Sequence, residues 1–170
     1  VGGAHAIAGL AWGVGPVPPS DVVVGPGNIY VTTAKKLIAG TVAIDMLAGP
    51  SELVVIADKS ANPVWIAADL LAQAEHDPEA MPILIATDAD LISAVETELR
   101  NQLVNLSTAD TAQVALSKGG VILCPNLLEA ARVSNAIAPE HLQLSIENSE
   151  KYVNKIENAG AIFLGEYTPE

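Results

Sequence analysis

The sequence has 170 residues and 50% of them are apolar, which is enough to bury the core of one domain, or of one domain and part of another. Eight lysines and arginines stand against 20 aspartates and glutamates, and the net charge of −12 argues against nucleic-acid binding, which needs clustered basic side chains. No apolar run reaches the ~18 residues of a membrane-spanning helix, so no membrane partner is expected.

Segments typical of strands and of helices alternate along the chain. The first part predicts a helix within 2–12 that ends at Gly13, a strand at 21–24, a helix at 29–38 and a strand at 42–44. The second part predicts strands at 53–57, 83–86, 121–124, 142–146 and 161–164, and helices at 63–76, 89–103, 109–117, 127–136 and 149–158. Apolar strands separated by helices indicate an α/β fold, a parallel sheet with helices on both faces.

The helix that follows Asn62 carries two polar side chains of interest. Asn62 is suited to cap it, and Pro63 suits its first position. Five residues at helical spacing predict its apolar face: Val64, Ala67, Ala68, Leu71 and Ala74. Gln73 and His76 project from another side, one turn apart, where an amide oxygen and an imidazole can bind one metal ion. Two solvated surface residues have the same spacing, so both interpretations stay open; Asp77 and the proline after it end the helix.

Residues 25–28, GPGN, join a strand to a helix. The N–H groups and dipole of such a helix start can face an anion. However, Tyr30 stands where a dinucleotide-binding motif would have its third glycine, and Pro26 removes one donor. A tight turn with Asn28 as the helix cap explains the motif equally well.

The turn AGPS at 48–51 is a candidate boundary between two parts of the chain, because its Gly-Pro pair separates two strand-like runs. The hydroxyl of Ser51 can either cap this turn or contact a ligand. The sequence leaves both roles open.

Glu140 and His141 form an acid–base pair after Pro139, which predicts an irregular, loop-like presentation of both side chains. An imidazole can accept a proton at neutral pH, and the glutamate offers a second proton relay. A solvated pair in a surface loop is the alternative.

Five strings resemble, in chain order, the histidinol dehydrogenases: GPGN (25–28), AIDMLAGPSELVVIAD (43–58), LLAQAEHD (70–77), APEHL (138–142) and FLGEYTPE (163–170). The resemblance covers essentially the whole chain. It implies a zinc- and NAD-dependent oxidation of L-histidinol through histidinal to L-histidine, the last step of histidine biosynthesis, in a homodimer. The single cysteine, Cys124, fits the reducing cytoplasm, or the plastid stroma of a plant.

The resemblance also implies residue roles. Gln73 and His76 match two zinc ligands of the family, and with Ser51 and His141 they match its substrate-binding residues. Glu140 and His141 match the proton acceptors.

For the cofactor, Asn28 matches an asparagine of the family that contacts NAD. His5 stands where the family usually has an NAD-contacting glutamine. Imidazole can still donate or accept a hydrogen bond there.

The family builds its larger domains as incomplete Rossmann-like sheets. Residues 1–50 are therefore expected to be the remnant of an NAD-binding Rossmann-like domain, and residues 51–170 a second such domain with the zinc-ligand and acid–base residues. We expect a central portion of a longer chain, inactive alone because the family's two other zinc ligands lie beyond residue 170. The alternatives are a zinc-dependent dehydrogenase of another small polar alcohol and a non-catalytic fragment without a complete metal site.

Overall fold

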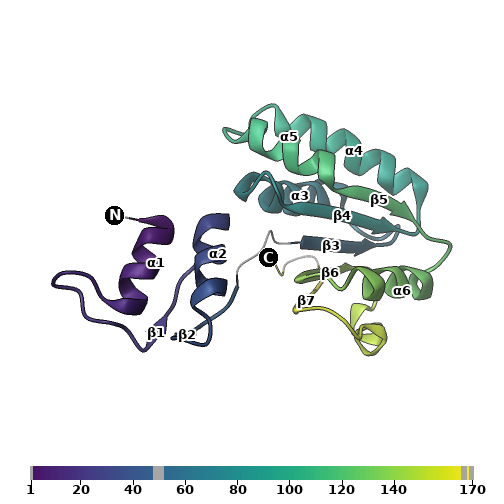
Figure 1. Cartoon of the computed structure of the whole chain (residues 1–170). Coiled ribbons are helices and arrows are strands. Elements are labelled where there is room, and N and C mark those ends of the chain that lie inside the picture. The colour runs from purple at the N-terminus through teal and green to yellow at the C-terminus, as the bar shows by residue number, and fades with distance from the viewer. Residues whose placement is uncertain (1, 48–51, 166–167, 169–170) are drawn as a thin grey trace. The chain divides into compact units, whose positions relative to one another are not determined.

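The computed structural model of the chain describes residues 2–47, 52–165 and 168. The chain divides into two compact units, Val1–Gly49 and Pro50–Glu170. The predicted boundary at 48–51, including Ser51, lies outside the described residues. Figure 1 shows the elements of each unit.

The first unit contains two helices and a pair of very short parallel strands. Its elements are α1 (Gly3–Trp12), β1 (Val22–Val23), α2 (Ile29–Ile38) and β2 (Ala43–Ile44). Helix α1 ends, as predicted, at Gly13, whose φ of 79° suits glycine. The buried core consists of Ile7, Ala11, Val23 and Ile38. Both strands have only two residues, so packing of α1 and α2 supplies most of this small core.

The second unit is built on a five-stranded parallel sheet. Its strands are β3 (Glu52–Ala57), β4 (Met81–Ala86), β5 (Gly120–Leu123), β6 (His141–Ser145) and β7 (Ala161–Leu164), in the order β5-β4-β3-β6-β7. The helices are α3 (Pro63–His76), α4 (Ala89–Leu103), α5 (Ala109–Lys118) and α6 (Leu127–Ile137). The chain moves outward from β3 to one edge and then returns to build the other half, which is the order of a Rossmann-like sheet. The predicted α/β fold is confirmed.

Strand β3 shows how the sheet is covered on both faces. Leu53 and Val55 pack against residues of α3 and α4, whereas Val54 and Ile56 pack in a core that includes residues of α6. All four side chains are at most 2% exposed, as a central parallel strand requires. Figure 1 shows α3, α4 and α5 on one side of the sheet and α6 on the other. None of the helices in the described ranges is long and apolar enough to cross a membrane.

The predicted apolar face of α3 is partly wrong. Val64 is 45% exposed and Ala68 is also exposed. The buried residues of the helix are instead Ile66, Ala67, Leu70, Leu71, Gln73 and Ala74. Helix α3 contributes to two cores, one shared with β3, β4 and α4 and the other with α5, so its buried surface is wider than a single stripe.

The helix predicted at 149–158 is two short 3₁₀ turns, η1 (Ser149–Lys151) and η2 (Val153–Lys155). Asn135 of α6 explains the difference, because its side chain binds backbone groups that a longer helix would use. Its Nδ2 donates to the carbonyl oxygen of Lys155 at 2.8 Å, and its Oδ1 accepts from the N–H of Glu157 at 2.8 Å.

We predict that backbone amides of α2 exchange with solvent faster than those of β3 when the 170-residue chain is measured by hydrogen–deuterium exchange. The first unit has few buried side chains and two-residue strands, so its local opening costs less free energy. Equal protection of α2 and β3 would contradict this prediction and indicate that both units open together.

Candidate active site

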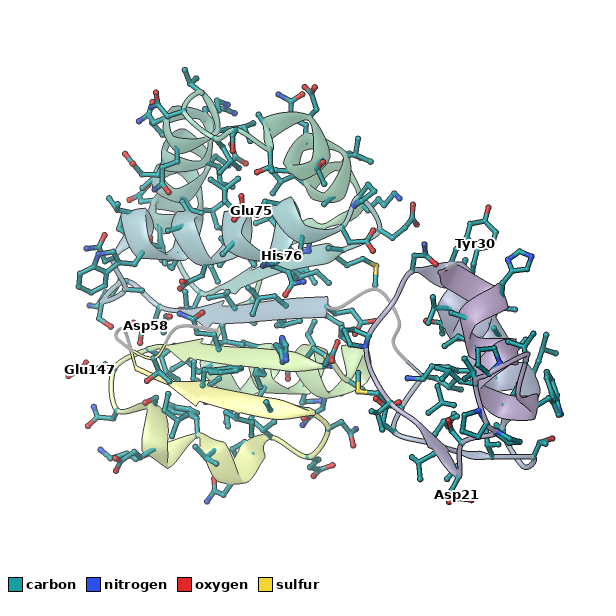
Figure 2. The ribbon with its side chains drawn as sticks, turned by 90° about the vertical axis from the view of Figure 1, so that its left-hand side faces the viewer. Asp21, Tyr30, Asp58, Glu75, His76 and Glu147 are labelled. Carbon is teal, nitrogen blue, oxygen red and sulfur yellow. The ribbon has the colours of Figure 1, made fainter. Side chains whose placement is uncertain are left out.

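Helix α3 and strand β6 bring predicted site residues to one edge of the sheet. Because α3 connects two parallel strands, it runs antiparallel to them, and its last turn returns to the edge where the strands begin. His76 is the last residue of α3 and His141 is the first of β6. The opposite edge contains Asp58 and Glu147, which follow β3 and β6 and are joined by a hydrogen bond of 3.1 Å (Figure 2).

One face of β6 is polar. His141, Gln143 and Ser145 alternate with two leucines that lie in the core on the α6 side, so the three polar residues face α3. The Nε2 of Gln143 donates to Oδ2 of Asp69 on α3 at 2.7 Å and to Oγ of Ser145 at 3.0 Å. These bonds join the helix to the strand.

This polar contact is partly buried, with Asp69 less enclosed than Gln143. Gln143 is 2% exposed, and its Oε1 is enclosed without a hydrogen-bond partner among the described residues. Burial raises the pKa of the Asp69 carboxyl, and the hydrogen bond from Gln143 opposes that rise. The pair is therefore a polar connection inside a largely apolar interface.

Asp69, Gln73 and His76 follow one another along α3 at intervals of four and three residues, so they form one row on the helix. Gln73 is only 6% exposed, whereas His76 is exposed at the helix end. The sequence does not predict this burial of Gln73. Glu75 accepts a hydrogen bond from Oγ1 of Thr108 at 2.6 Å and is thus directed toward α5.

The donor atoms of Gln73 and His76 suit zinc in kind but not in number. An amide oxygen and an imidazole nitrogen are both ligands that zinc accepts. A zinc site in a protein has about four ligands. No group of three or more histidine, cysteine, aspartate and glutamate side chains that could hold a metal ion occurs within the described ranges.

Glu140 and His141 differ in local conformation. Glu140 lies exposed in a bend, as the prediction for this pair requires. His141 is instead the first residue of β6, because it pairs with Leu53 of β3 and Ala161 of β7. Its ring lies edge-on to Phe163, with centroids 5.6 Å apart and an angle of 86° between the planes. The prediction of a loop position was therefore wrong for His141.

Gly160 allows the chain to approach Glu140 closely. Its N–H donates to the carbonyl oxygen of Pro139 at 3.0 Å. A Cβ atom at position 160 would lie 2.6 Å from the carbonyl oxygen of Glu140, which is too close for contact with a backbone atom. A residue larger than glycine would therefore displace the bend that presents Glu140.

In the first unit, Asn28 caps helix α2. Its Oδ1 accepts from the N–H groups of Tyr30 and Val31, each at 3.2 Å, so the prediction of a capped turn is confirmed. Its side chain is exposed, as is that of His5 on α1. The roles of both residues toward NAD stay predictions.

A buried lysine holds the GPGN loop. Lys35 of α2 is 1% exposed, forms an ion pair with Asp45, and donates from Nζ to the carbonyl oxygen of Gly25 at 2.7 Å. Asp45 accepts from the N–H groups of Gly25 and Met46, each at 2.7 Å. The hydrogen bond from Lys35, followed by those from the two N–H groups, lowers the pKa of Asp45.

The sequence reasoning missed Lys35, Asp69 and Gln143, although each left a signal. Lys35 lies four residues after Val31 and three before Ile38, on the apolar side of its helix. Gln143 interrupts the apolar run of a predicted strand. Asp69 precedes Gln73 by four residues, the spacing of one helical turn.

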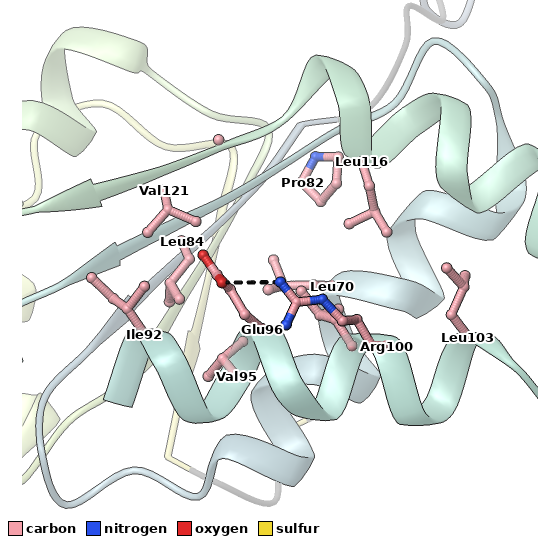
Figure 3. A pocket seen from close by; sticks show the side chains of 12 residues that line it. Leu70, Pro82, Leu84, Ile92, Val95, Glu96, Arg100, Leu103, Leu116 and Val121 are labelled. Atoms are coloured by element: carbon pink, nitrogen blue, oxygen red, sulfur yellow. Dashed lines mark hydrogen bonds and ion pairs between the residues drawn. The ribbon is translucent and has the colours of Figure 1, made fainter. Parts of the chain in front are cut away.

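Two other hollows of the second unit are described by their lining residues. The groove in Figure 3 is lined mainly by apolar side chains, with the ion pair of Glu96 and Arg100 at 3.4 Å. The second hollow lies beyond the ends of β3, β4 and β5. Its Asp58, Asp88 and Asn126 each accept a hydrogen bond from a nearby backbone N–H group.

The sequence model of one protein family, described as histidinol dehydrogenase, matches residues 1–170. The chain belongs to the histidinol dehydrogenase family. The relative from Methylococcus capsulatus, named histidinol dehydrogenase, is 53% identical over all of this chain and 39% of its own length. The relative of the same name from Thermus thermophilus is 52% identical over all of this chain and 41% of its own length. The chain thus spans about two fifths of these relatives.

One solved structure agrees with this family assignment. The crystal structure of histidinol dehydrogenase from Elizabethkingia anophelis has a TM-score of 0.95 and 43% identity, covering 99% of this chain and 39% of that one. γ-Glutamyl phosphate reductase from Thermotoga maritima has a TM-score of 0.56 at 14% identity over 85% of this chain and 41% of that one. The second likeness concerns the fold alone.

We predict that Asp45→Asn weakens protection of the Gly25 and Met46 amides at pH 7, because the carboxylate that binds both N–H groups and Lys35 is lost. The pKa of Asp45 is lowered in the folded chain, so its stabilisation is present above the ordinary carboxyl value of about 3.9 and declines as pH falls below it. The difference in amide exchange between the wild type and the variant should therefore shrink at acid pH.

The control is Asp21→Asn, which alters an exposed carboxylate in the same unit. A difference between wild type and Asp45→Asn that stays constant from pH 7 to pH 3 would contradict the assigned role of the carboxylate.

Proposed function

We propose that this chain forms the acid–base part and half of the metal site of a histidinol dehydrogenase. The reaction is the oxidation of L-histidinol through histidinal to L-histidine, with NAD as hydride acceptor. The observation that carries the proposal is the convergence of α3 and β6, which bring the Gln73–His76 row and His141 to one edge of the sheet. Membership of the histidinol dehydrogenase family supports the choice of substrate.

His141 is the proton acceptor of the first oxidation. Its imidazole would take the hydroxyl proton of the alcohol, while NAD, when bound, would supply the acceptor for the hydride. The edge-on contact with Phe163 and the pairing of His141 in β6 limit how far the ring can turn. An imidazole held in this way is oriented before the substrate arrives.

Glu140 serves the second oxidation. Its carboxylate would take a proton from the water that adds to the aldehyde carbon, which prepares the hydrate for the second oxidation. Its exposed position on the bend between α6 and β6 leaves the carboxylate accessible to water. Gly160 supports this role because the absence of a Cβ atom allows the bend to stay in place.

Gln73 and His76 would hold zinc, which when bound anchors the imidazole and amino nitrogens of the substrate. Ser51 would contact the same substrate. On this proposal residues 1–50 are the remnant of an NAD-binding domain, with His5 and Asn28 toward the cofactor. Residues 51–170 form the second domain, and the complete enzyme is a homodimer.

The role of His141 can be tested in a hybrid protein in which this chain replaces the matching segment of the Methylococcus capsulatus relative. We predict that His141→Asn lowers kcat for histidinol oxidation by roughly 10²–10⁴, the usual contribution of a positioned acid–base group. Histidinol binding should change much less. Asp21→Asn, which alters an exposed carboxylate without a proposed role in the site, is the control and should retain turnover.

A His141→Asn hybrid with near wild-type kcat at neutral pH would remove His141 from the mechanism. An unmodified hybrid that oxidises another small polar alcohol in place of histidinol would contradict the proposed substrate.

We further predict that the isolated 170-residue chain binds zinc weakly and does not oxidise histidinol. Two neutral ligands leave about half of a tetrahedral site to water and offset none of the charge of the dication. Equilibrium dialysis against micromolar zinc, with NADH formation measured on the same sample, checks both parts. Tight stoichiometric zinc together with NADH production would show that the chain needs no further ligands.

A further inference from the structure

Building on the proposed function, we propose that the Asp69–Gln143 hydrogen bond positions the active site. It fixes the position of α3 along the axis of β6, so that Gln73 faces His141. Asp69 and Gln143 are thus positioning residues and need not touch the substrate. The proposal depends on three features of the second unit: the direction of α3, the spacing of the residues and the burial of the Gln143 side chain.

The spacing follows from the geometry of helix and strand. Gln73 lies four residues after Asp69, which is about 6 Å along a helix. His141 lies two residues before Gln143, which is about 6.6 Å along a strand. Because α3 runs antiparallel to β6, these two steps point in the same direction. A hydrogen bond between Asp69 and Gln143 therefore brings Gln73 and His141 to the same position along the strand axis.

The faces on which these side chains lie also agree with a contact between Gln73 and His141. Residues four apart on a helix share one face, and residues two apart on a strand share one face. Since the carboxylate of Asp69 reaches the amide of Gln143 at 2.7 Å, the longer side chain of Gln73 can reach the ring of His141 from the same helix. The burial of Gln73 fits such a position between helix and strand.

The hydrogen bond restricts the position of α3 along β6, which apolar packing alone does not. The rest of the α3–sheet interface buries alanine, leucine and isoleucine, and such contacts are non-directional. A hydrogen bond depends steeply on distance and angle, so a shift of α3 by one residue, about 1.5 Å, would break it. The Asp69–Gln143 hydrogen bond therefore selects one position of α3 along β6 from the several that apolar contacts tolerate.

The side-chain oxygen of Gln143, which binds none of the described residues, agrees with this arrangement. Its Nε2 binds both Asp69 and Ser145, so Oε1, on the other branch of the amide, points away from them. Along this face of β6 the neighbour on that side is His141. Oε1 is buried and has no hydrogen-bond partner among the residues that the structure describes. The side chain thus offers a buried acceptor toward the end of the strand where the reaction is proposed.

The test is nuclear Overhauser spectroscopy on the 170-residue chain, which needs neither zinc nor NAD. We expect contacts between the side-chain amide protons of Gln73 and the ring protons of His141 in the wild type. They should disappear in Asp69→Ala and in Gln143→Leu. Asp69→Asn keeps an oxygen that can accept from Gln143, so this conservative variant should retain them.

The matched control is Thr108→Val, which removes a hydrogen bond of α3 to α5 rather than to β6. It should leave the Gln73–His141 contacts unchanged. Contacts between β3 and β4 report whether each variant remains folded. Absence of the Gln73–His141 contacts in the wild type, or their persistence in both folded Asp69→Ala and Gln143→Leu, would overturn the proposal.

Kinetics of the hybrid protein separate this inference from the proposed function. Asp69→Ala should lower kcat about 10²-fold, the effect of a misplacement near 1 Å, whereas Asp69→Asn should recover most of it. An unmodified hybrid that oxidises no histidinol would contradict the proposed function, while the spectroscopic result would still decide the role of Asp69. Normal kcat in Asp69→Ala would show that the hydrogen bond does not position the site.

Discussion

The architecture of the second unit depends on the burial of β3 between two parallel neighbours. Its central side chains are almost completely enclosed, and every β3 residue pairs with β4 while most also pair with β6. A parallel strand needs a crossover to reach its neighbour, and the crossovers to the two sides of β3 cover opposite faces. Helix α3 therefore occupies one face and α6 the other. The positions of the candidate catalytic residues follow from these two crossovers.

Rossmann-like sheets commonly bind ligands beyond the carboxyl ends of their strands. In this unit Asp58 and Asp88 at that edge accept hydrogen bonds from nearby backbone N–H groups, and Asp58 also joins the ends of β3 and β6. The candidate residues lie instead where the strands begin. That arrangement is possible because α3 ends with a polar row and β6 begins with a polar face, two features that meet at the amino edge.

Partly buried polar contacts recur at the two places where the proposed chemistry needs a defined geometry. In the first unit, the Lys35–Asp45 ion pair and its bonds to Gly25 hold the loop before Asn28. In the second, the bond between Asp69 and Gln143 joins α3 to β6. A buried polar group without its partner is costly, so each contact opposes rearrangement of the segment that it joins.

The sequence by itself determined the alternation of strands and helices, the caps at Asn28 and Asn62, and the end of α3 at His76, because these depend on neighbouring residues. Its motifs also identified the family. The tertiary structure alone decided that Gln73 is buried, that His141 belongs to β6, and that residues 149–155 form 3₁₀ turns. These features arise from partners distant in the chain: strands on both sides of His141, and Asn135 beside the turns. Local propensity carries no information about such partners, since they are chosen by packing and by hydrogen bonds across the fold.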